Sequence, residues 1–160
     1  MALTAGQVES VQLYSGVESQ VVEAQEGTSI EANVWYKGDL VKFAGDGKVD
    51  AVATTGAISG IAGSAVTRTS DTKFDLFLID PAAIYEMRVE YTKYSALAYV
   101  GNKYGLNFTT GMQRVDPDNA STVDIYIVGI HPSDKHADGS TGLDEGRVLV
   151  RFNYDIFIGV

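Results

Sequence analysis

The last fourteen residues, Arg147 to Val160, read RVLVRFNYDIFIGV and indicate the fold class more clearly than any other stretch. Apolar side chains occupy every even position from Val148 to Val160, while several odd positions hold Arg, Asn or Asp. A period of two sustained over this length is typical of a β-strand with one buried face. We therefore expect this stretch to form a strand at the border of a core.

Three further stretches carry strand patterns. Tyr85 to Tyr91 alternates apolar and charged residues, which predicts a second strand with one solvent-exposed face. Residues 74–79 and 123–130 are apolar on both faces instead. Strands that are buried on both faces have this composition, so these two stretches predict the central strands of a sandwich or barrel.

The first half of the chain predicts shorter elements. Residues 30–43 suggest two short strands broken at Lys37-Gly38-Asp39, and Gly45-Asp46-Gly47 predicts a hairpin turn because Asp-Gly suits positive φ angles. Residues 54–70, rich in Gly, Ala, Ser and Thr, predict a strand, a loop and a strand. Residues 92–100 are compatible with two helical turns, with Thr92 as the cap.

Together these patterns predict an all-β domain: a small β-barrel, a β-tulip-like domain or a sandwich, with at most one short helix. Residues 23–160 form this domain, and residues 1–22 are either an extended N-terminal arm or its first strand. Both alternatives need the same half-apolar, extended pattern. The apolar side chains expected to contact a neighbouring subunit are Val8, Val11, Leu13, Tyr14, Val17 and Val21, together with Trp35.

Charge and cysteine content limit the possible functions. The chain has 12 Lys and Arg against 21 Asp and Glu, a net charge of −9, and no cysteine. Nucleic-acid binders neutralise phosphates with basic side chains, so this balance argues against nucleic acid and against anionic membranes as partners. We expect neither a signal peptide nor a membrane-spanning segment, and we expect synthesis in a cytoplasm.

No combination of residues in the sequence is typical of catalysis. Nucleophilic catalysis needs a Ser, Thr or Cys beside an oriented base, and the only histidines are His131 and His136. The glycine-rich strings at 56–63 and 139–142 lack the lysine and the helix context of a phosphate-binding loop. We therefore expect no enzymatic activity, no catalytic residues and no cofactor.

One loop has the spacing of a calcium site. Asp134, Asp138 and Glu145 stand at relative positions 1, 5 and 12, with Gly139 at position 6, as in an EF-hand loop. However, His136 occupies a position where a hard cation prefers oxygen, and the flanking residues predict strands instead of helices. A polar surface loop is the favoured interpretation, and the three acidic residues remain a weak candidate metal site. A transition-metal site on the two histidines is weaker still.

The order of turns and strands resembles the capsid decoration (cement) proteins of tailed bacteriophages. The segments that carry the resemblance are residues 38–43, 54–63, 78–81, 100–106 and 146–152. The resemblance implies a non-enzymatic virion protein that is made in the bacterial cytoplasm and binds the capsid exterior. Such a protein clamps neighbouring subunits of the major capsid protein, often as a homotrimer, so many weak contacts sum to a large stabilisation.

The main alternative is a β-barrel or sandwich that binds a glycan or another small ligand, for example in host recognition. Trp35, Tyr36 and the polar loop at 131–145 would form its binding surface. A buried or interfacial position for Trp35 is the competing interpretation, because this residue lies in an apolar strand.

Overall fold

The computed structural model describes residues 10–16, 21–25, 34–43, 48–52, 58–67, 73–90, 97–109, 112–121, 124–134 and 146–153. Within these ranges the regular elements are β-strands and two short 3-10 turns, η1 (Leu97–Tyr99) and η2 (Pro132–Asp134). The predicted all-β class is confirmed. No helix among the described residues is long and apolar enough to cross a membrane.

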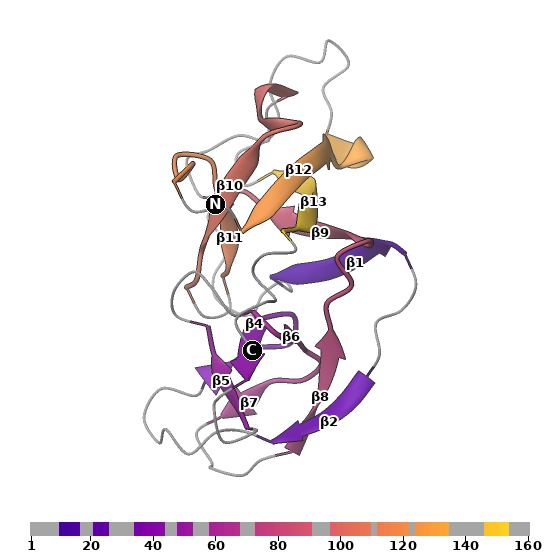
Figure 1. Ribbon diagram of the computed structural model, residues 1–160, viewed down its shortest axis with the longest axis vertical. Helices are drawn as coiled ribbons and strands as arrows, with labels where there is room; N and C mark the ends of the chain where they lie inside the picture. The colour runs from indigo at the N-terminus through magenta and orange to yellow at the C-terminus, as the bar shows by residue number, and fades with distance from the viewer. Residues whose placement is uncertain are drawn as a thin grey trace.

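The larger sheet of the described chain has six antiparallel strands and lies in the upper half of Figure 1. In spatial order the strands are β1 (Val11–Ser15), β9 (Ile84–Arg88), β13 (Arg147–Phe152), β12 (Ile125–Ile130), β10 (Lys103–Asn107) and β11 (Arg114–Asp116). This sheet curls back on itself. Val89, directly after β9, forms a parallel bridge with Val115 of β11, and the Glu90 N–H donates to the Val115 carbonyl at 3.0 Å.

The second sheet has five described strands and lies in the lower half of Figure 1. Its spatial order is β2 (Val21–Gln25), β8 (Lys73–Leu78), β6 (Gly60–Ala62), β4 (Leu40–Phe43) and β5 (Val49–Ala51). A two-stranded ribbon of β3 (Val34–Trp35) and β7 (Val66–Thr67) accompanies it. All of these pairings are antiparallel.

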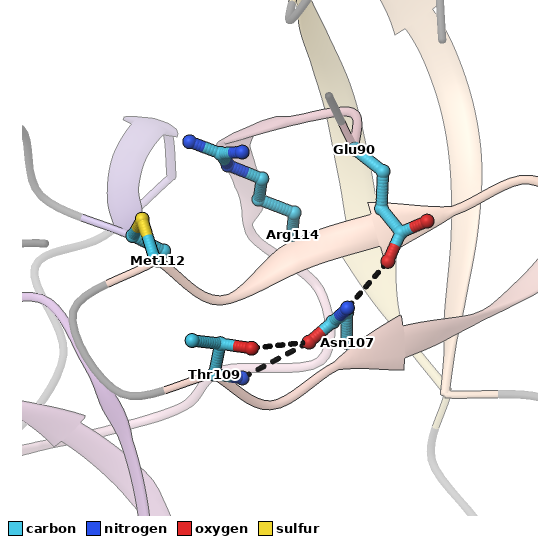
Figure 2. Close-up of a pocket in the computed structure, with 5 residues that line it drawn as sticks. All are labelled: Glu90, Asn107, Thr109, Met112 and Arg114. Atoms are coloured by element: carbon cyan, nitrogen blue, oxygen red, sulfur yellow. Dashed lines mark hydrogen bonds between the residues drawn. The ribbon is translucent and has the colours of Figure 1, made fainter. Parts of the chain in front are cut away.

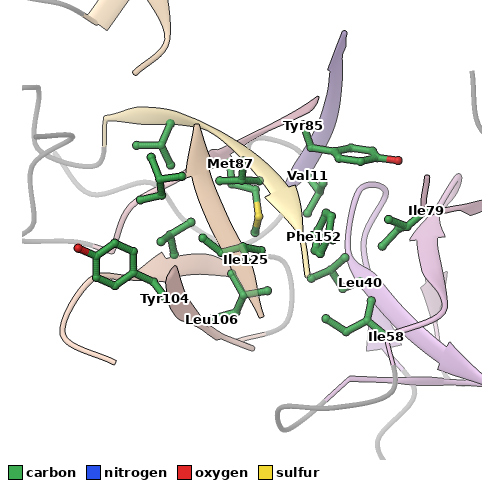
Figure 3. Close-up of a cluster of buried hydrophobic side chains, with 14 of the residues drawn as sticks. Val11, Leu40, Ile58, Ile79, Tyr85, Met87, Tyr104, Leu106, Ile125 and Phe152 are labelled. Atoms are coloured by element: carbon green, nitrogen blue, oxygen red, sulfur yellow. The ribbon is translucent and has the colours of Figure 1, made fainter. Parts of the chain in front are cut away.

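The five-stranded sheet has buried side chains on both faces. Successive side chains of a strand point to opposite sides, so neighbours in one strand enter different clusters. Leu40 enters the larger core cluster, and its neighbour Val41 enters a smaller one with Trp35. The larger cluster combines side chains of both sheets, as Figure 3 shows with Leu40 and Ile58 beside Phe152 and Ile125. One hydrophobic core therefore joins the two sheets.

The predicted alternation at the C-terminus is confirmed where it is described. Val148, Val150 and Phe152 are buried in β13, while Arg151 is exposed. Residues 154–160, the remainder of the predicted strand, lie outside the described residues. The alternation from Tyr85 is likewise confirmed, since Tyr85, Met87 and Val89 are all buried.

The two stretches that are apolar on both faces form interior strands, as predicted. β8 lies between β2 and β6, and β12 lies between β13 and β10. β4 and β5 form the predicted hairpin, although its turn at 44–47 is outside the described residues. Of the helix considered at 92–100, the described part contains only the 3-10 turn η1, while residues 91–96 are not described.

Most of the described residues of segment 1–22 lie in two strands. β1 pairs with β9 in the larger sheet, with Val11 opposite Met87, and Val11 is part of the shared core. β2 begins at Val21 and pairs with β8 in the other sheet. Residues 1–9 and 17–20 are outside the described residues. Val11–Ser15 is thus a strand of the domain.

Candidate functional site

A group of paired charged side chains lies on the outward face of the six-stranded sheet, around Arg147 at the start of β13. Asp134 in η2 receives three hydrogen bonds from Arg147: from the backbone N–H at 2.6 Å, from Nε at 3.2 Å and from Nη2 at 2.8 Å. Glu86 of β9 lies on the other side, with Oε1 at 3.6 Å from Arg147 Nη1. Arg147 thus ties η2 to the neighbouring strand β9.

The electrostatics of this group favour its charged form. Burial alone would raise the pKa of Asp134, but the hydrogen bonds and positive charge of Arg147 outweigh burial and lower that pKa below its ordinary value. The side-chain hydrogen bonding that Arg147 donates to Asp134 in turn raises the pKa of Arg147. Asp134 is therefore an ionised carboxylate held by a guanidinium, an arrangement that is strong because it is charge-assisted and bidentate.

His131 and Tyr14 extend the group towards the edge strand β1. His131 Nε2 lies 3.4 Å from Glu86 Oε2, while its Nδ1 accepts a hydrogen bond from the Ser133 N–H at 3.2 Å. The Tyr14 ring packs edge-on against the imidazole, with ring centroids 5.5 Å apart. A neutral His131 therefore carries its proton on Nε2, directed at Glu86. These side chains pair with one another, and their contacts hold β1, β9, β13 and η2 together.

The three acidic residues predicted as a weak metal site are only partly described. Asp134 uses both carboxylate oxygens to accept hydrogen bonds from Arg147, so a cation would have to displace that guanidinium. Asp138 and Glu145, like His136, lie outside the described residues. The described ranges contain no group of three or more His, Cys, Asp or Glu side chains that could hold a metal ion.

The predicted interface residues are divided between core and surface. Val11 and Trp35 are each 1% exposed, so both lie in the interior, and Trp35 packs against Phe74 with ring centroids 5.0 Å apart. Leu13 and Tyr14 are exposed at 39% and 43%. Val8 and Val17 are outside the described residues, and of Val21 only the backbone pairing is described.

The aromatic binding surface considered for Trp35 and Tyr36 lacks its tryptophan. Tyr36 is exposed, but the neighbouring Trp35 side chain points into the smaller core cluster. Of the polar loop at 131–145, the described residues end at Asp134. The two aromatic rings therefore do not share one surface.

A small polar pocket marks the seam where the larger sheet curls back. It has a volume of about 190 Å³ and is lined by Glu90, Asn107, Thr109, Met112 and Arg114 (Figure 2). Asn107 donates to Glu90 and accepts from both the backbone N–H and the hydroxyl of Thr109. These side chains pair with one another, and the hydrogen bond between Asn107 and Glu90 holds β10 against the segment after β9.

A different surface lies on the outward face of β10, β12 and β13, which are neighbours in the sheet (Figure 1). Lys103, Tyr126 and Arg151 form one row across these strands, because Tyr126 is the register partner of both cations. The Lys103 ammonium lies 4.8 Å from the centroid of the Tyr126 ring. Beside this row is an open hollow of about 410 Å³, lined by Pro81, Tyr126, Val128, Arg151, Phe152 and Asn153.

Sequence reasoning did not identify this row or the polar pocket. Alternation places Tyr126 and Arg151 on the outward faces of their own strands. It does not reveal which strands are neighbours or in which register they pair, and a one-residue slip would turn every side chain to the other face. The sequence alone therefore gives no reason to place Lys103 beside Tyr126 and Arg151.

Comparison with known proteins assigns no family to this geometry. No protein-family model matches the chain, and no curated protein matches it. The exposed surfaces of the six-stranded sheet are the features from which a function is argued.

Proposed function

We propose that this chain is a structural protein of a bacteriophage virion that binds the outside of the capsid and stabilises the shell by clamping neighbouring major capsid subunits. The observation that carries the proposal is the exposure of Leu13 and Tyr14 on β1. β1 is an edge strand of the described sheet, and it lies in the segment expected to contact a subunit. Large apolar side chains exposed on an edge strand favour association with another chain.

The segments that carry the resemblance to decoration proteins support the same function. Where they are described, these segments include β4, β6, β10 and β13, which belong to both sheets. The resemblance therefore extends over the framework of the domain and is not confined to one hairpin. A homotrimer on the capsid exterior is the assembly that the resemblance implies.

A clamp needs at least two contact areas, one for each neighbouring subunit. β1 and β12 are separated in the larger sheet by β9 and β13, and both present exposed apolar side chains. Tyr14 is 43% exposed on the first strand, and Val128 is 41% exposed on the second. Two separated areas of this kind suit a protein that bridges two partners, and avidity multiplies their individually weak binding.

The test is binding to empty, expanded shells assembled from the major capsid protein of the same phage genome. We expect the chain to sediment with the shells in a saturable ratio and to raise the temperature at which the shells rupture. Light scattering of the free chain tests the proposed trimer. Failure of the wild-type chain to bind shells at high micromolar concentration would contradict the proposed function.

A matched pair of variants tests the role of β1. Leu13→Ser combined with Tyr14→Ser should weaken shell binding by about tenfold or more, because truncation of central apolar contacts costs upwards of about 1 kcal/mol. Phe43→Ser is the control, since Phe43 is also 43% exposed but lies on the five-stranded sheet. Equal losses from both changes would show that β1 has no special role.

A further inference from the structure

Two cations on the outward face of β10, β12 and β13 have no ion-pair partner among the described residues, in a chain rich in carboxylates. The chain carries 21 acidic residues against 12 basic ones. Even so, neither Lys103 nor Arg151 makes an ion pair or hydrogen bond through its side chain with any described residue, although both are exposed. The one contact of the Lys103 ammonium is the Tyr126 ring. Arg147, by contrast, is engaged by two carboxylates.

Apolar surface surrounds these cations. Val128 is the extra residue of a β-bulge between Ile127 and Gly129, and the bulge leaves its side chain 41% exposed. Val128 and Pro81 line the hollow of about 410 Å³ together with Arg151. The surface therefore combines positive charge at Lys103 and Arg151 with apolar walls.

We propose that this face is a docking surface for a protein segment in which carboxylates alternate with apolar side chains. A carboxylate of the partner accepts two hydrogen bonds from the Arg151 guanidinium, and a second carboxylate pairs with Lys103. An apolar side chain of the same segment occupies the hollow beside Arg151, against Pro81 and Val128. This surface includes Val128, one of the two contact areas of the proposed clamp, so the inference rests on the proposed function for its partner and names the chemistry of the segment bound there. The peptide test below involves no capsid shells, so its failure is distinguishable from failure of the proposed function.

The charge of the whole chain favours an acidic protein segment over a polyanion. A nucleic acid or an anionic membrane extends far beyond two cations, so it would also meet the repulsion of a chain with net charge −9. A short acidic segment satisfies Lys103 and Arg151 without that repulsion. Its apolar side chains gain from the hollow, whereas phosphate groups would not.

The test uses the full chain and two synthetic peptides, acetyl-ELELE-amide and its neutral match acetyl-QLQLQ-amide. Amide proton–nitrogen NMR spectra are recorded during titration with each peptide. We expect the acidic peptide to shift the amides of Tyr126, Val128 and Arg151 and to leave those of β4 and β5 unchanged. Raising the salt from about 20 mM to about 500 mM should weaken this binding several-fold, because exposed ion pairs are screened.

Variants separate the role of the cations from general electrostatics. Arg151→Gln should weaken binding of the acidic peptide by about tenfold, as expected for loss of a charge-assisted pair. Lys103→Gln should have a smaller effect in the same direction. Lys42→Gln removes the same charge from β4 on the other sheet and should leave binding unchanged. A spectrum otherwise identical to that of the wild type shows that each variant is folded.

Four results would overturn the proposal. The first is the absence of any shift at millimolar acidic peptide, and the second is an equal response to the neutral peptide. The third is tighter binding of a single-stranded DNA oligonucleotide to the same residues, which would indicate a nucleic-acid site. The fourth is binding of free glutamate as tightly as the peptide, which would indicate a small-molecule site.

Discussion

At the residue scale, a buried hydrogen-bond network connects three distant parts of the chain. The Ser10 hydroxyl donates to Asp39 Oδ1 at 2.6 Å and accepts from the Gln113 N–H at 3.2 Å. Gln113 in turn exchanges hydrogen bonds with the backbone of Leu40. Ser10, Asp39 and Gln113 are all buried. Because buried polar groups are costly when unpaired, the network fixes β1 against the turn before β4 and the start of β11.

Replacement of Ser10 should expose the cost of breaking this network. Ser10→Ala removes one donor and one acceptor and leaves an Asp39 oxygen and the Gln113 N–H without that partner. We expect a loss of about 1–3 kcal/mol in the free energy of unfolding, measured by urea denaturation. Ser121→Ala is the control, because Ser121 is exposed and, among the described residues, its hydroxyl hydrogen-bonds only to the side-chain oxygen of the half-buried Asn119. A change below about 0.5 kcal/mol in both variants would contradict the argument.

Asp134 and Asp124 should give opposite pH dependences of stability. The pKa of Asp134 is lowered from its ordinary value of 3.8, so Asp134 adds to the free energy of unfolding above pH 3.8. This stabilisation is lost as the pH falls through the lowered pKa. Burial raises the pKa of Asp124, against the opposing effect of its hydrogen bond from the Leu106 N–H. The contribution of Asp124 is therefore present below pH 3.8 and is lost as the pH rises through its raised pKa.

The measurement is the urea midpoint of Asp134→Asn and Asp124→Asn, each relative to the wild type, from about pH 3 to about pH 7. Asp134→Asn should lose stability relative to the wild type as the pH rises, and Asp124→Asn should gain it. The other carboxylates are common to all three chains and cancel in the difference. Parallel curves for the two variants would show that the environments of these aspartates do not differ as described.

At the element scale, close backbone packing explains part of the glycine-rich string at 56–63. Gly60 is the first residue of β6, between β4 and β8, and a Cβ there would lie 2.6 Å from the Phe77 carbonyl oxygen and 2.5 Å from Leu76 Cδ1. A side chain would thus push β8 away from β6. At this position the glycine permits two neighbouring strands to approach.

Gly60→Ala should therefore destabilise the chain by about 1–3 kcal/mol, the usual cost of overpacking. Gly129→Ala is the matched control, since Gly129 also lies in a strand but its added Cβ would meet Leu149 Cδ1 at an ordinary 3.7 Å. Thermal or urea unfolding measures both variants. Equal destabilisation would mean that loss of glycine itself, and not the contact with β8, sets the cost.

Removal of β1 tests whether segment 1–22 is a separate arm. Deletion of residues 1–22 removes Val11 from the shared core, Ser10 from the buried network and a strand paired with β9. We expect the shortened chain to lose cooperative unfolding, whereas deletion of residues 1–9 removes no described residue. Circular dichroism during heating measures both chains. A chain lacking 1–22 that unfolds at the wild-type temperature would restore the arm interpretation.

The sequence predicted individual strands better than their arrangement. The alternation at Tyr85 to Val89 and at Val148 to Phe152 identified both the strands and their buried faces, because a period of two depends only on local burial. The pairing of β9 with β13 joins residues about sixty positions apart, and local patterns carry no such information. The row at Tyr126 depends on two pairings of this kind, so it emerged only from the fold.

At the scale of the whole molecule, the two sheets depend on one another. The larger core cluster contains Leu40 and Ile61 from the five-stranded sheet and Val150 and Ile127 from the six-stranded sheet. Neither sheet can bury these side chains alone, and a sheet with one exposed apolar face is unstable in water. The exposed surfaces of β1 and β12 lie in one sheet, so pairing through β9 and β13 holds them in fixed relation.

A shared core predicts a single unfolding transition seen by two separate probes. Trp35, the one tryptophan of the sequence, reports by fluorescence on the smaller cluster behind β4, while amide exchange in β12 and β13 reports on the curled sheet. We expect both probes to give the same urea midpoint.

Leu40→Ala should cost about 2–5 kcal/mol and shift both probes equally, because Leu40 lies between the sheets. Val41→Ala, which acts through the smaller cluster, should also shift both. If Trp35 responded to Val41→Ala while exchange in β12 and β13 did not, the two sheets would be separate folding units and the shared core would not couple them.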